Sequence, residues 1–259
     1  MPVDVTLTKG VLIVAAGVAS GFINAIVGSG SLISFPALVG QGFARLPANI
    51  ANNIGQFPGS ISAVYGYRKE LKNQQARIKK LVPASFLGSV TGALLLLKFP
   101  DSFQQVVPFL VLLGVALVLL APHVQARVKA RQAAGAAQKH PDQINALTTG
   151  IVLLAGIYGG YFGAGQGVIL VGVLGMAISD ELVRINALKN VLVTIVNGIA
   201  AVIFVIRGNV PWLAAGLIGI GAIVGAQLGA RLGRKIPPTV LRRFIAVIGV
   251  VAALKLFFD

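Results

Sequence analysis

A glycine-rich apolar motif occurs twice in this chain, about 135 residues apart. The first copy, GFINAIVGSGSLISFPALVGQG, covers residues 21–42, and the second, GIYGGYFGAGQGVILVGVLGMA, covers residues 156–177. Alignment of the two copies places Gly28 opposite Gly163. Apolar stretches that are broken by glycine at matching positions of two halves are the best sequence pointer to the central site of a transporter built from internal repeats.

The composition indicates that lipid is the solvent of this fold. The chain is 56% hydrophobic and 11% charged, with a mean hydropathy of +0.86, whereas soluble domains are about 25% charged. Its 32 glycines suit transmembrane helices, which small residues allow to pack closely. The chain has no cysteine, and this excludes disulfides, thiolate metal sites and thiol-based sulfur transfer.

The apolar segments predict an all-α, polytopic membrane protein. At about 20 residues each, six segments are long enough to cross a bilayer: 46–67, 80–98, 104–121, 186–206, 210–230 and 240–258. Four more flank the glycine motifs: 8–28, 30–43, 145–162 and 166–179. Because the second member of each flanking pair is short, we expect two helix hairpins, broken at residues 28–30 and 163–165, whose full crossing is left open.

The basic residues predict the topology. Loops 68–80, 122–143 and 231–243 hold 15 of the 22 Lys and Arg residues, so the positive-inside rule places them in the cytoplasm. This clustering explains the net charge of +15 without nucleic-acid binding. Both termini are then periplasmic, and the first apolar run, which has no basic residues ahead of it, is expected to be a retained span.

Each half has three crossings and one hairpin that returns to its own side. Because three is odd, the second half has the opposite orientation in the membrane. The sequence therefore predicts two inverted-topology repeats. Residues 1–121 form the N-terminal repeat, residues 122–143 a basic cytoplasmic linker that need not be ordered, and residues 144–259 the inverted C-terminal repeat.

The hairpin turns are candidates for an anion site. Irregular backbone at membrane depth must be buried in protein or line an aqueous cavity, and helices that begin there direct N–H groups and a positive dipole end at its contents. Neutral side-chain donors would come from Ser29, Ser31 and Gln166. The alternative is that these glycines only permit close packing. The spacing does not fit a dinucleotide-binding loop. The turn residues that we assign to the site are Gly28, Ser29, Gly30, Ser31, Gly163, Gly165, Gln166 and Gly167.

A polar stripe follows each motif on one face of the next predicted helix. The first half contributes Asn49, Asn52, Asn53, Gln56 and Ser60, and the second contributes Asn186, Lys189, Asn190 and Asn197. All of these except Ser60 are assigned to the substrate site. Interhelical hydrogen bonding that holds the bundle together is an alternative role. Lys189 should face a cavity or a partner, since a charge inside a span is costly, unless it snorkels to the headgroups near Arg184.

Acidic residues and histidines are absent from the interiors of the predicted spans. The seven acidic residues and both histidines lie in loops or near the ends of spans, so there is no obvious proton relay, and Asp180 and Glu181 are the only candidates near the membrane. No nucleophile and base are placed for hydrolysis. We expect no enzyme activity, no cofactor and no metal site.

The paired glycine motifs, the asparagine-bearing helix after each, the basic central loop and the length together resemble the TauE/SafE sulfite-exporter family, also called the toluene-sulfonate uptake permease superfamily. The resemblance covers nearly the whole chain. It implies a bacterial inner-membrane carrier for small sulfur-containing anions such as sulfite, sulfoacetate or other organosulfonates. Ser31 stands where a third glycine is often found in the family, so the resemblance does not fix sulfite as the substrate.

These observations predict a carrier with a midplane anion site and alternating access. Export is favoured, because the inside-negative potential drives an anion outward by about 2.3 kcal/mol per charge per 100 mV. The alternatives are an anion channel or facilitator and a non-transporting membrane scaffold or assembly factor. The partners expected are a small anion and the lipid bilayer. The anion, the direction of transport, any coupling ion and the oligomeric state, with a homodimer as one alternative, stay open.

Overall fold

The structure is a computed structural model, and it describes residues 3–133, 144–233 and 238–258. Throughout these residues the regular structure is helical, without strands, which confirms the predicted all-α fold. The helices are α1 (Leu7–Ile26), α2 (Ser31–Gly40), α3 (Arg45–Gly66), α4 (Gln75–Lys98), α5 (Pro100–Ala133), α7 (Ala146–Tyr161), α8 (Gln166–Ala177), α9 (Leu182–Arg207), α10 (Trp212–Leu232) and α11 (Pro238–Phe258).

The main difference from the predicted segments concerns α5. We expected this span to end at residue 121, but the helix continues to Ala133, so the first part of the predicted linker is helical. Residues 122–133 are rich in Ala, Gln, Arg and Lys, which favour helix without giving an apolar signal. The rest of the predicted linker, residues 134–143, lies outside the described residues.

The second helix of each hairpin is too short to cross a bilayer. With 10 residues in α2 and 12 in α8, and a rise of about 1.5 Å per residue, these helices extend roughly 15 and 18 Å, against a hydrocarbon core of about 30 Å. The α1–α2 and α7–α8 hairpins therefore turn inside the protein.

Within the part of the chain that the structure describes, five helices are long and apolar enough, by length and composition, to span a membrane: α1, α4, α5, α9 and α10. Two of the predicted crossings, α3 and α11, are not among them. The polar stripe interrupts α3, and α11 carries Arg242, Arg243 and Lys255.

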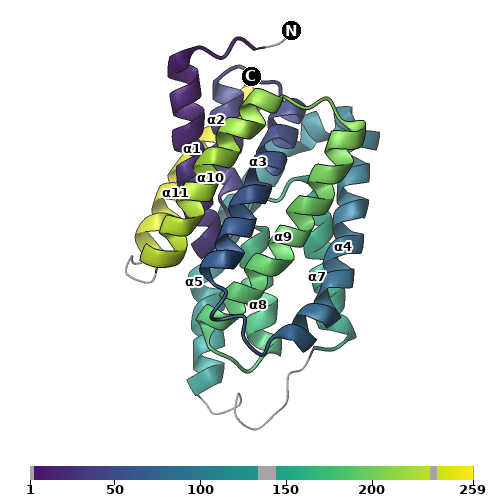
Figure 1. The fold of residues 1–259 in the computed structure, drawn as a ribbon, viewed down its shortest axis with the longest axis vertical. Coiled ribbons are helices and arrows are strands. Elements are labelled where there is room, and N and C mark those ends of the chain that lie inside the picture. The colour runs from purple at the N-terminus through teal and green to yellow at the C-terminus, as the bar shows by residue number, and fades with distance from the viewer. Residues whose placement is uncertain (1–2, 134–143, 234–237, 259) are drawn as a thin grey trace.

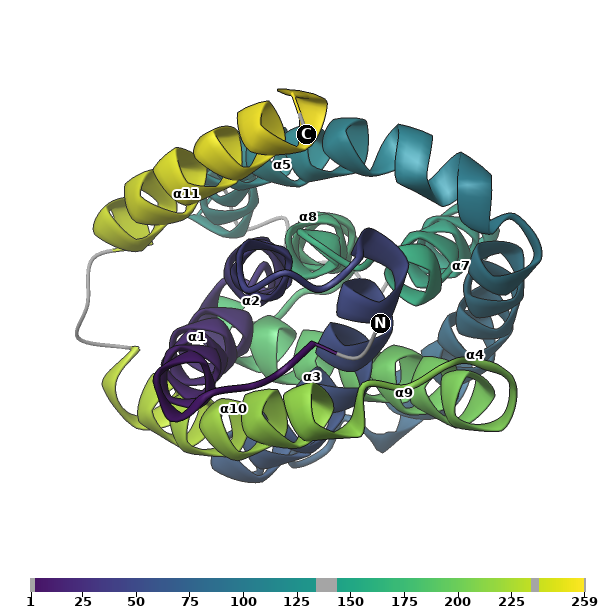
Figure 2. The ribbon, with the colours of Figure 1, turned by 90° about the horizontal axis from the view of Figure 1, so that it is seen from above.

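The helices pair in a reciprocal pattern between the halves. Helix α1 packs along α10 as α7 packs along α4, α10 packs on α3 as α4 packs on α9, and α2 contacts α11 as α8 contacts α5. In the view from above (Figure 2), α2 and α8 lie between a layer that contains α10, α3, α9 and α4 and a layer formed by α5 and α11. Such a pattern is what a two-fold relation between the halves would produce.

Glycines allow the closest of these pairings. A Cβ atom on Gly17 of α1 would lie 3.2 Å from the Cα atom of Gly221 in α10, and one on Gly88 of α4 would lie 2.9 Å from the Cα atom of Gly156 in α7. The α1–α10 and α4–α7 pairs therefore pack backbone against backbone, as small residues permit in membranes.

The molecule has two distinct ends (Figure 1). One, the terminal end, has the start of α1, the end of α11, the α2–α3 loop (residues 41–44) and the α9–α10 loop (residues 208–211). The other, the basic end, has the α3–α4 loop (residues 67–74), the α8–α9 loop (residues 178–181) and the start of α11.

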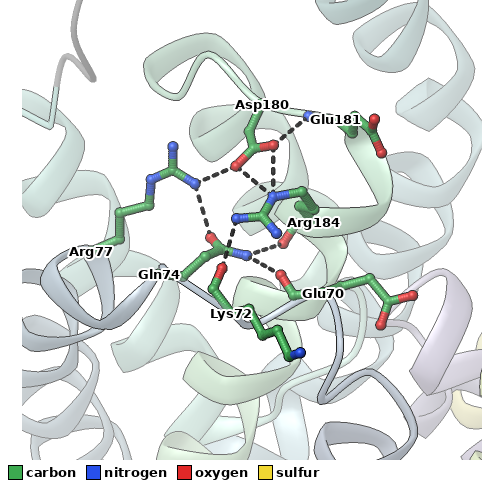
Figure 3. A network of polar contacts seen from close by, with 7 residues as sticks. All are labelled: Glu70, Lys72, Gln74, Arg77, Asp180, Glu181 and Arg184. Atoms are coloured by element: carbon green, nitrogen blue, oxygen red, sulfur yellow. Dashed lines mark hydrogen bonds and ion pairs between the residues drawn. The ribbon is translucent and has the colours of Figure 1, made fainter.

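Ion pairs join the halves at the basic end (Figure 3). The Asp180 carboxylate accepts hydrogen bonds from Nη1 of Arg77 at 2.5 Å and from Nε of Arg184 at 2.8 Å. The Gln74 amide donates to the carbonyl oxygens of Glu70 and Arg184, at 2.8 and 3.0 Å. The start of α4 is thus bonded to the α8–α9 loop and to α9.

Candidate functional site

The two glycine motifs end their helices in the same way. The N–H of Gly28 donates to the carbonyl of Ile23 at 3.2 Å, and the N–H of Gly163 donates to the carbonyl of Tyr158 at 3.0 Å. Both glycines are left-handed, with φ of 83° and 85°, a conformation that commonly ends a helix and that glycine adopts without strain. The predicted breaks therefore lie at these glycines.

The two turns meet each other. The N–H of Gly167, at the start of α8, donates to the carbonyl oxygen of Gly28 at 3.0 Å, and a Cβ atom on either glycine would overlap the backbone of the other. This contact, which we call the hairpin crossing, lies where the α1–α2 hairpin from the terminal end reaches the α7–α8 hairpin from the basic end. The N–H group of Gly167, which we expected to face an anion, is therefore used within the protein.

The polar stripe of α9 binds the end of α1. Lys189 donates from Nζ to the carbonyl of Asn24 at 2.9 Å, and the amides of Asn186 and Asn190 donate to the carbonyl of Ala25 at 3.0 and 3.3 Å. Carbonyls in the last turn of a helix have no intrahelical partner, and a cation is favourable beside them. Because Lys189 is completely buried and directed inward, the snorkelling interpretation does not fit.

The stripe of α3 makes the counterpart contact. Asn49, which falls opposite Asn186 once a two-residue gap is allowed in the alignment of the halves, donates from Nδ2 to the carbonyl of Tyr161 at 3.0 Å, in the last turn of α7. Each stripe thus caps the hairpin of the other half. This contact supports the packing role that the sequence left open for the amides, at least for part of each stripe.

A serine cluster joins the α3 stripe to its own hairpin. Ser34 donates to Oδ1 of Asn52 at 2.5 Å and accepts from Nε2 of Gln56 at 3.2 Å, and Gln56 also bonds Ser20. All four side chains are buried. Ser20 and Ser34 were not predicted as site residues, because each is a small polar residue on a largely apolar helix.

Several polar atoms around the hairpin crossing are buried without a hydrogen-bond partner. Two can donate, Oγ of Ser29 and Nε2 of Gln166, and each belongs to a residue adjacent in sequence to a glycine of the crossing. The others are the Oδ1 atoms of Asn49, Asn53 and Asn186 and Oε1 of Gln56. Since buried polar groups are nearly always paired, such a concentration indicates a place that a ligand or water completes.

Comparison with known proteins agrees with this geometry. Residues 13–256 match the profile of the family described as "Sulfite exporter TauE/SafE". The chain belongs to the TauE/SafE family. It is similar to the "Probable membrane transporter protein YfcA" of Escherichia coli (strain K12), at 29% identity over 255 residues, 98% of this chain and 91% of that protein. A "Probable membrane transporter protein" of Haemophilus influenzae is 25% identical over 260 residues, 99% and 97% of the two chains.

A third relative supports the same class. The "Probable membrane transporter protein ORF9" of Sinorhizobium sp is 29% identical over 255 residues, 96% of this chain and 92% of that protein. Together with the apolar helices, these matches identify this TauE/SafE member as a multi-pass membrane transporter and not an enzyme.

Not every predicted site residue joins the crossing. Asn197 is buried two turns beyond Asn190 on α9, and the hydrogen bonds found among the described residues do not link it to the turns. Ser31 is only half-buried. The turn glycines also differ, because Gly30 has φ of −57° whereas Gly165 has φ of +87°.

Two cavities approach the interior from opposite ends. One of about 900 Å³ lies at the terminal end, between the N-terminal segment, the α2–α3 loop and the α9–α10 loop. The other, a crevice of about 190 Å³, opens at the basic end and reaches Asn186 on the α9 stripe.

Proposed function

We propose that this TauE/SafE transporter exports a small sulfur-containing oxyanion, such as sulfite, sulfoacetate or another organosulfonate, by alternating access around the hairpin crossing. The observation that carries the proposal is the pair of buried donors without a partner, Ser29 Oγ and Gln166 Nε2, whose residues directly adjoin Gly28 and Gly167 in sequence. The family description supplies the sulfur chemistry.

The charge around the crossing favours an anion. Lys189 is fully buried, and a Cβ atom on Gly167 would lie 3.0 Å from its Cδ atom, so the lysine is beside the crossing. The sequences of α1, α2, α3, α7, α8 and α9 contain no Asp or Glu. A buried ammonium needs a counter-charge or several hydrogen bonds, and an oxyanion supplies both.

The orientation in the membrane follows from the basic end. The positive-inside rule places that end in the cytoplasm, which puts both termini in the periplasm of a bacterial inner membrane. The reciprocal pairing of the helices supports an inverted relation between the halves, and rocking of one half against the other would alternate access. The membrane potential then drives a monovalent anion outward by about 2.3 kcal/mol per 100 mV.

Efflux from proteoliposomes tests the proposal. Vesicles loaded with radiolabelled sulfite, sulfoacetate, sulfate or acetate should release a sulfur oxyanion at a rate that saturates with concentration and rises with an imposed potential. Gln166→Ala and Ser29→Ala remove donors whose loss leaves no protein group unpaired, so the variants should fold and transport more slowly. Gln105→Ala, at an exposed glutamine of α5, is the matched control.

Three results count against this function. A rate that does not saturate indicates a channel, and equal release of acetate and the sulfur anions removes the assigned substrate class. If Gln166→Ala and Ser29→Ala transport as fast as Gln105→Ala, the site does not lie at the hairpin crossing.

A further inference from the structure

We propose that the crevice at the basic end is a second anion site, in which Arg242 captures a small oxyanion from the cytoplasm before it reaches the hairpin crossing. This inference rests on the proposed function, since it assigns the first binding step of the exported anion. From the sequence Arg242 was expected to be a cytoplasmic loop charge, but the residue lies within α11.

The crevice is built from both halves. The ends of α1 and α3 form one side with Ile26 and Tyr67, and the start of α9 forms another with Val183 and Asn186. Helices α5, α8 and α11 close the rest, and the α11 contribution is Arg242. At about 190 Å³, it has room for a few waters of about 30 Å³ each, or for one small oxyanion with some of its water.

Arg242 is the charged group of this crevice. Its exposed fraction is 6%, and its Nη2 donates to Oε1 of Gln125 at 2.5 Å, which is a neutral partner. The Nε atom is buried with no hydrogen-bond partner. A guanidinium is always charged and presents donors in a planar fork that matches the oxygens of an oxyanion, so the free Nε edge is suited to such a ligand.

The crevice leads toward the hairpin crossing but is separated from it. A void of about 10 Å³ shares Val27, Gln125 and Val171 with the crevice and extends to Ala121 and Val168. Val27 and Val168 directly adjoin Gly28 and Gly167 in sequence. A void of this size holds one water at most, and its walls are almost entirely apolar. An anion bound at Arg242 would therefore wait at a constriction that must widen before it moves on.

The native chain has no cysteine, so one introduced thiol can report the charge inside the crevice. Val183→Cys places it on the crevice wall. Labelling rates of the purified protein are measured with two methanethiosulfonates, one carrying a sulfonate and one a trimethylammonium group. We expect the anionic reagent to be favoured, and Arg242→Gln to lower the anionic-to-cationic rate ratio about tenfold, as removal of one nearby charge predicts. Millimolar sulfoacetate, which does not attack disulfides, should slow labelling only where Arg242 is present.

The matched control is the neighbouring residue. Arg243 is exposed on the same helix turn, so Arg243→Gln removes the same formal charge outside the crevice and should leave the rate ratio and the sulfoacetate protection unchanged. Arg242→Lys should keep most of the ratio. If Arg242→Gln is not monodisperse, Leu213→Cys at the terminal end replaces it as the comparison, and only Val183→Cys should show anion preference.

The outcomes separate this proposal from the transport function. The Arg242 site is wrong if Arg242→Gln and Arg243→Gln change the rate ratio equally. It is also wrong if sulfoacetate does not slow the labelling of Val183→Cys when Arg242 is present. Both results would hold even when proteoliposomes export a sulfur anion. If the ratio depends on Arg242 and sulfoacetate protects, the site stands even when the efflux assay rejects export.

Discussion

The terminal and basic ends of the molecule are built from corresponding elements of the two halves. They differ in depth of closure: the basic end is closed at its rim, and the terminal end is closed deeper inside. At the basic end the rim is joined by Asp180 and two arginines (Figure 3), while the crevice that contains Arg242 lies open beneath it. At the terminal end the rim encloses about 900 Å³, while the deeper space is filled by four aromatic rings. These are Phe35, Phe103, Tyr161 and Phe162, packed edge to face or tilted with centroids 5.3 to 6.2 Å apart.

The difference lies in side-chain chemistry rather than in backbone arrangement. Corresponding elements line both deep spaces: the end of the hairpin helix α1 or α7, the start of α9 or α3, and α11 or α5. The space at the basic end holds one arginine and two amides among mostly apolar side chains, whereas aromatic rings fill the one at the terminal end. The two halves therefore share one backbone plan but present a buried arginine, Arg242, at the basic end and an aromatic plug at the terminal end.

The largest effect is expected from opening the aromatic plug. Phe162 is 2% exposed and packs edge to face on Phe35. Replacement of a buried phenylalanine by alanine costs about 3–5 kcal/mol, so Phe162→Ala should lower the free energy of unfolding by that order in detergent, measured by denaturant titration.

The control for the plug is Phe109→Ala. Phe109 is 61% exposed, although it also packs on a ring, Phe257, and its loss should cost about 1 kcal/mol. Equal costs at Phe109 and Phe162 would show that the terminal space is not a packed plug, and the comparison between the ends would fail there.

A smaller loss of stability is expected when the hairpin crossing, which lies between the two ends, is altered. Gly28→Ala adds a methyl group that overlaps the Gly167 backbone and strains a residue with φ of +83°. Left-handed backbone costs about 1–2 kcal/mol outside glycine and overpacking about 1–3 kcal/mol, which together lower the melting temperature. Gly42→Ala isolates the first term, because Gly42 has φ of +95° but open space around it. If the two variants melt alike, the crossing is not tightly packed.

Much of this architecture was predictable from the sequence. The hairpin turns follow from glycines that interrupt apolar runs, and the spans follow from long apolar runs. Both kinds of element lie within a few residues of their predicted bounds, apart from the earlier start of α4 and the later end of α5. The α5 continuation beyond residue 121 was not predicted, because its apolar signal is limited to Val124 and Val128, which pack on α8, among Ala, Gln, Arg and Lys.

The site was predictable as a set of residues but not as a set of contacts. That Lys189 bonds Asn24, 165 positions away, depends on how α9 packs against α1, and no local pattern encodes it. Arg242 illustrates the same limit, because its position in the sequence does not show whether its guanidinium is solvated in a loop or buried on α11. Its neighbour Arg243 is exposed, and the sequence alone gives the two the same interpretation.

Anion binding should distinguish the two stripes. Lys189→Met keeps the apolar stem but removes the charge, so stabilisation by sulfoacetate, which amounts to about 2.7 kcal/mol at 100 times the dissociation constant, should disappear. Asn52 is the counterpart of Lys189 in the N-terminal half, where it accepts a hydrogen bond from Ser34. Asn52→Ala should cost about 1 kcal/mol of stability and keep the response to sulfoacetate. Thermal unfolding with and without the anion measures both, and a full response in Lys189→Met would place the anion away from the α9 stripe.

The smallest effect concerns the rim at the basic end. Burial alone would raise the pKa of Asp180, but hydrogen bonds from Arg77 and Arg184 outweigh it and hold that pKa below its ordinary value of 3.8. A lowered pKa in the folded state stabilises the fold above the unfolded value, and this contribution is lost as the pH falls through the folded value. Asp180→Asn should therefore lower the free energy of unfolding at pH 6 by less than about 1 kcal/mol, seen as a slightly lower melting temperature, and this difference should shrink as the pH falls below 3.8. Glu181→Gln, at the exposed neighbour, is the matched control, and if Asp180→Asn costs no more stability than Glu181→Gln at pH 6, the rim is not held by the Asp180 ion pairs.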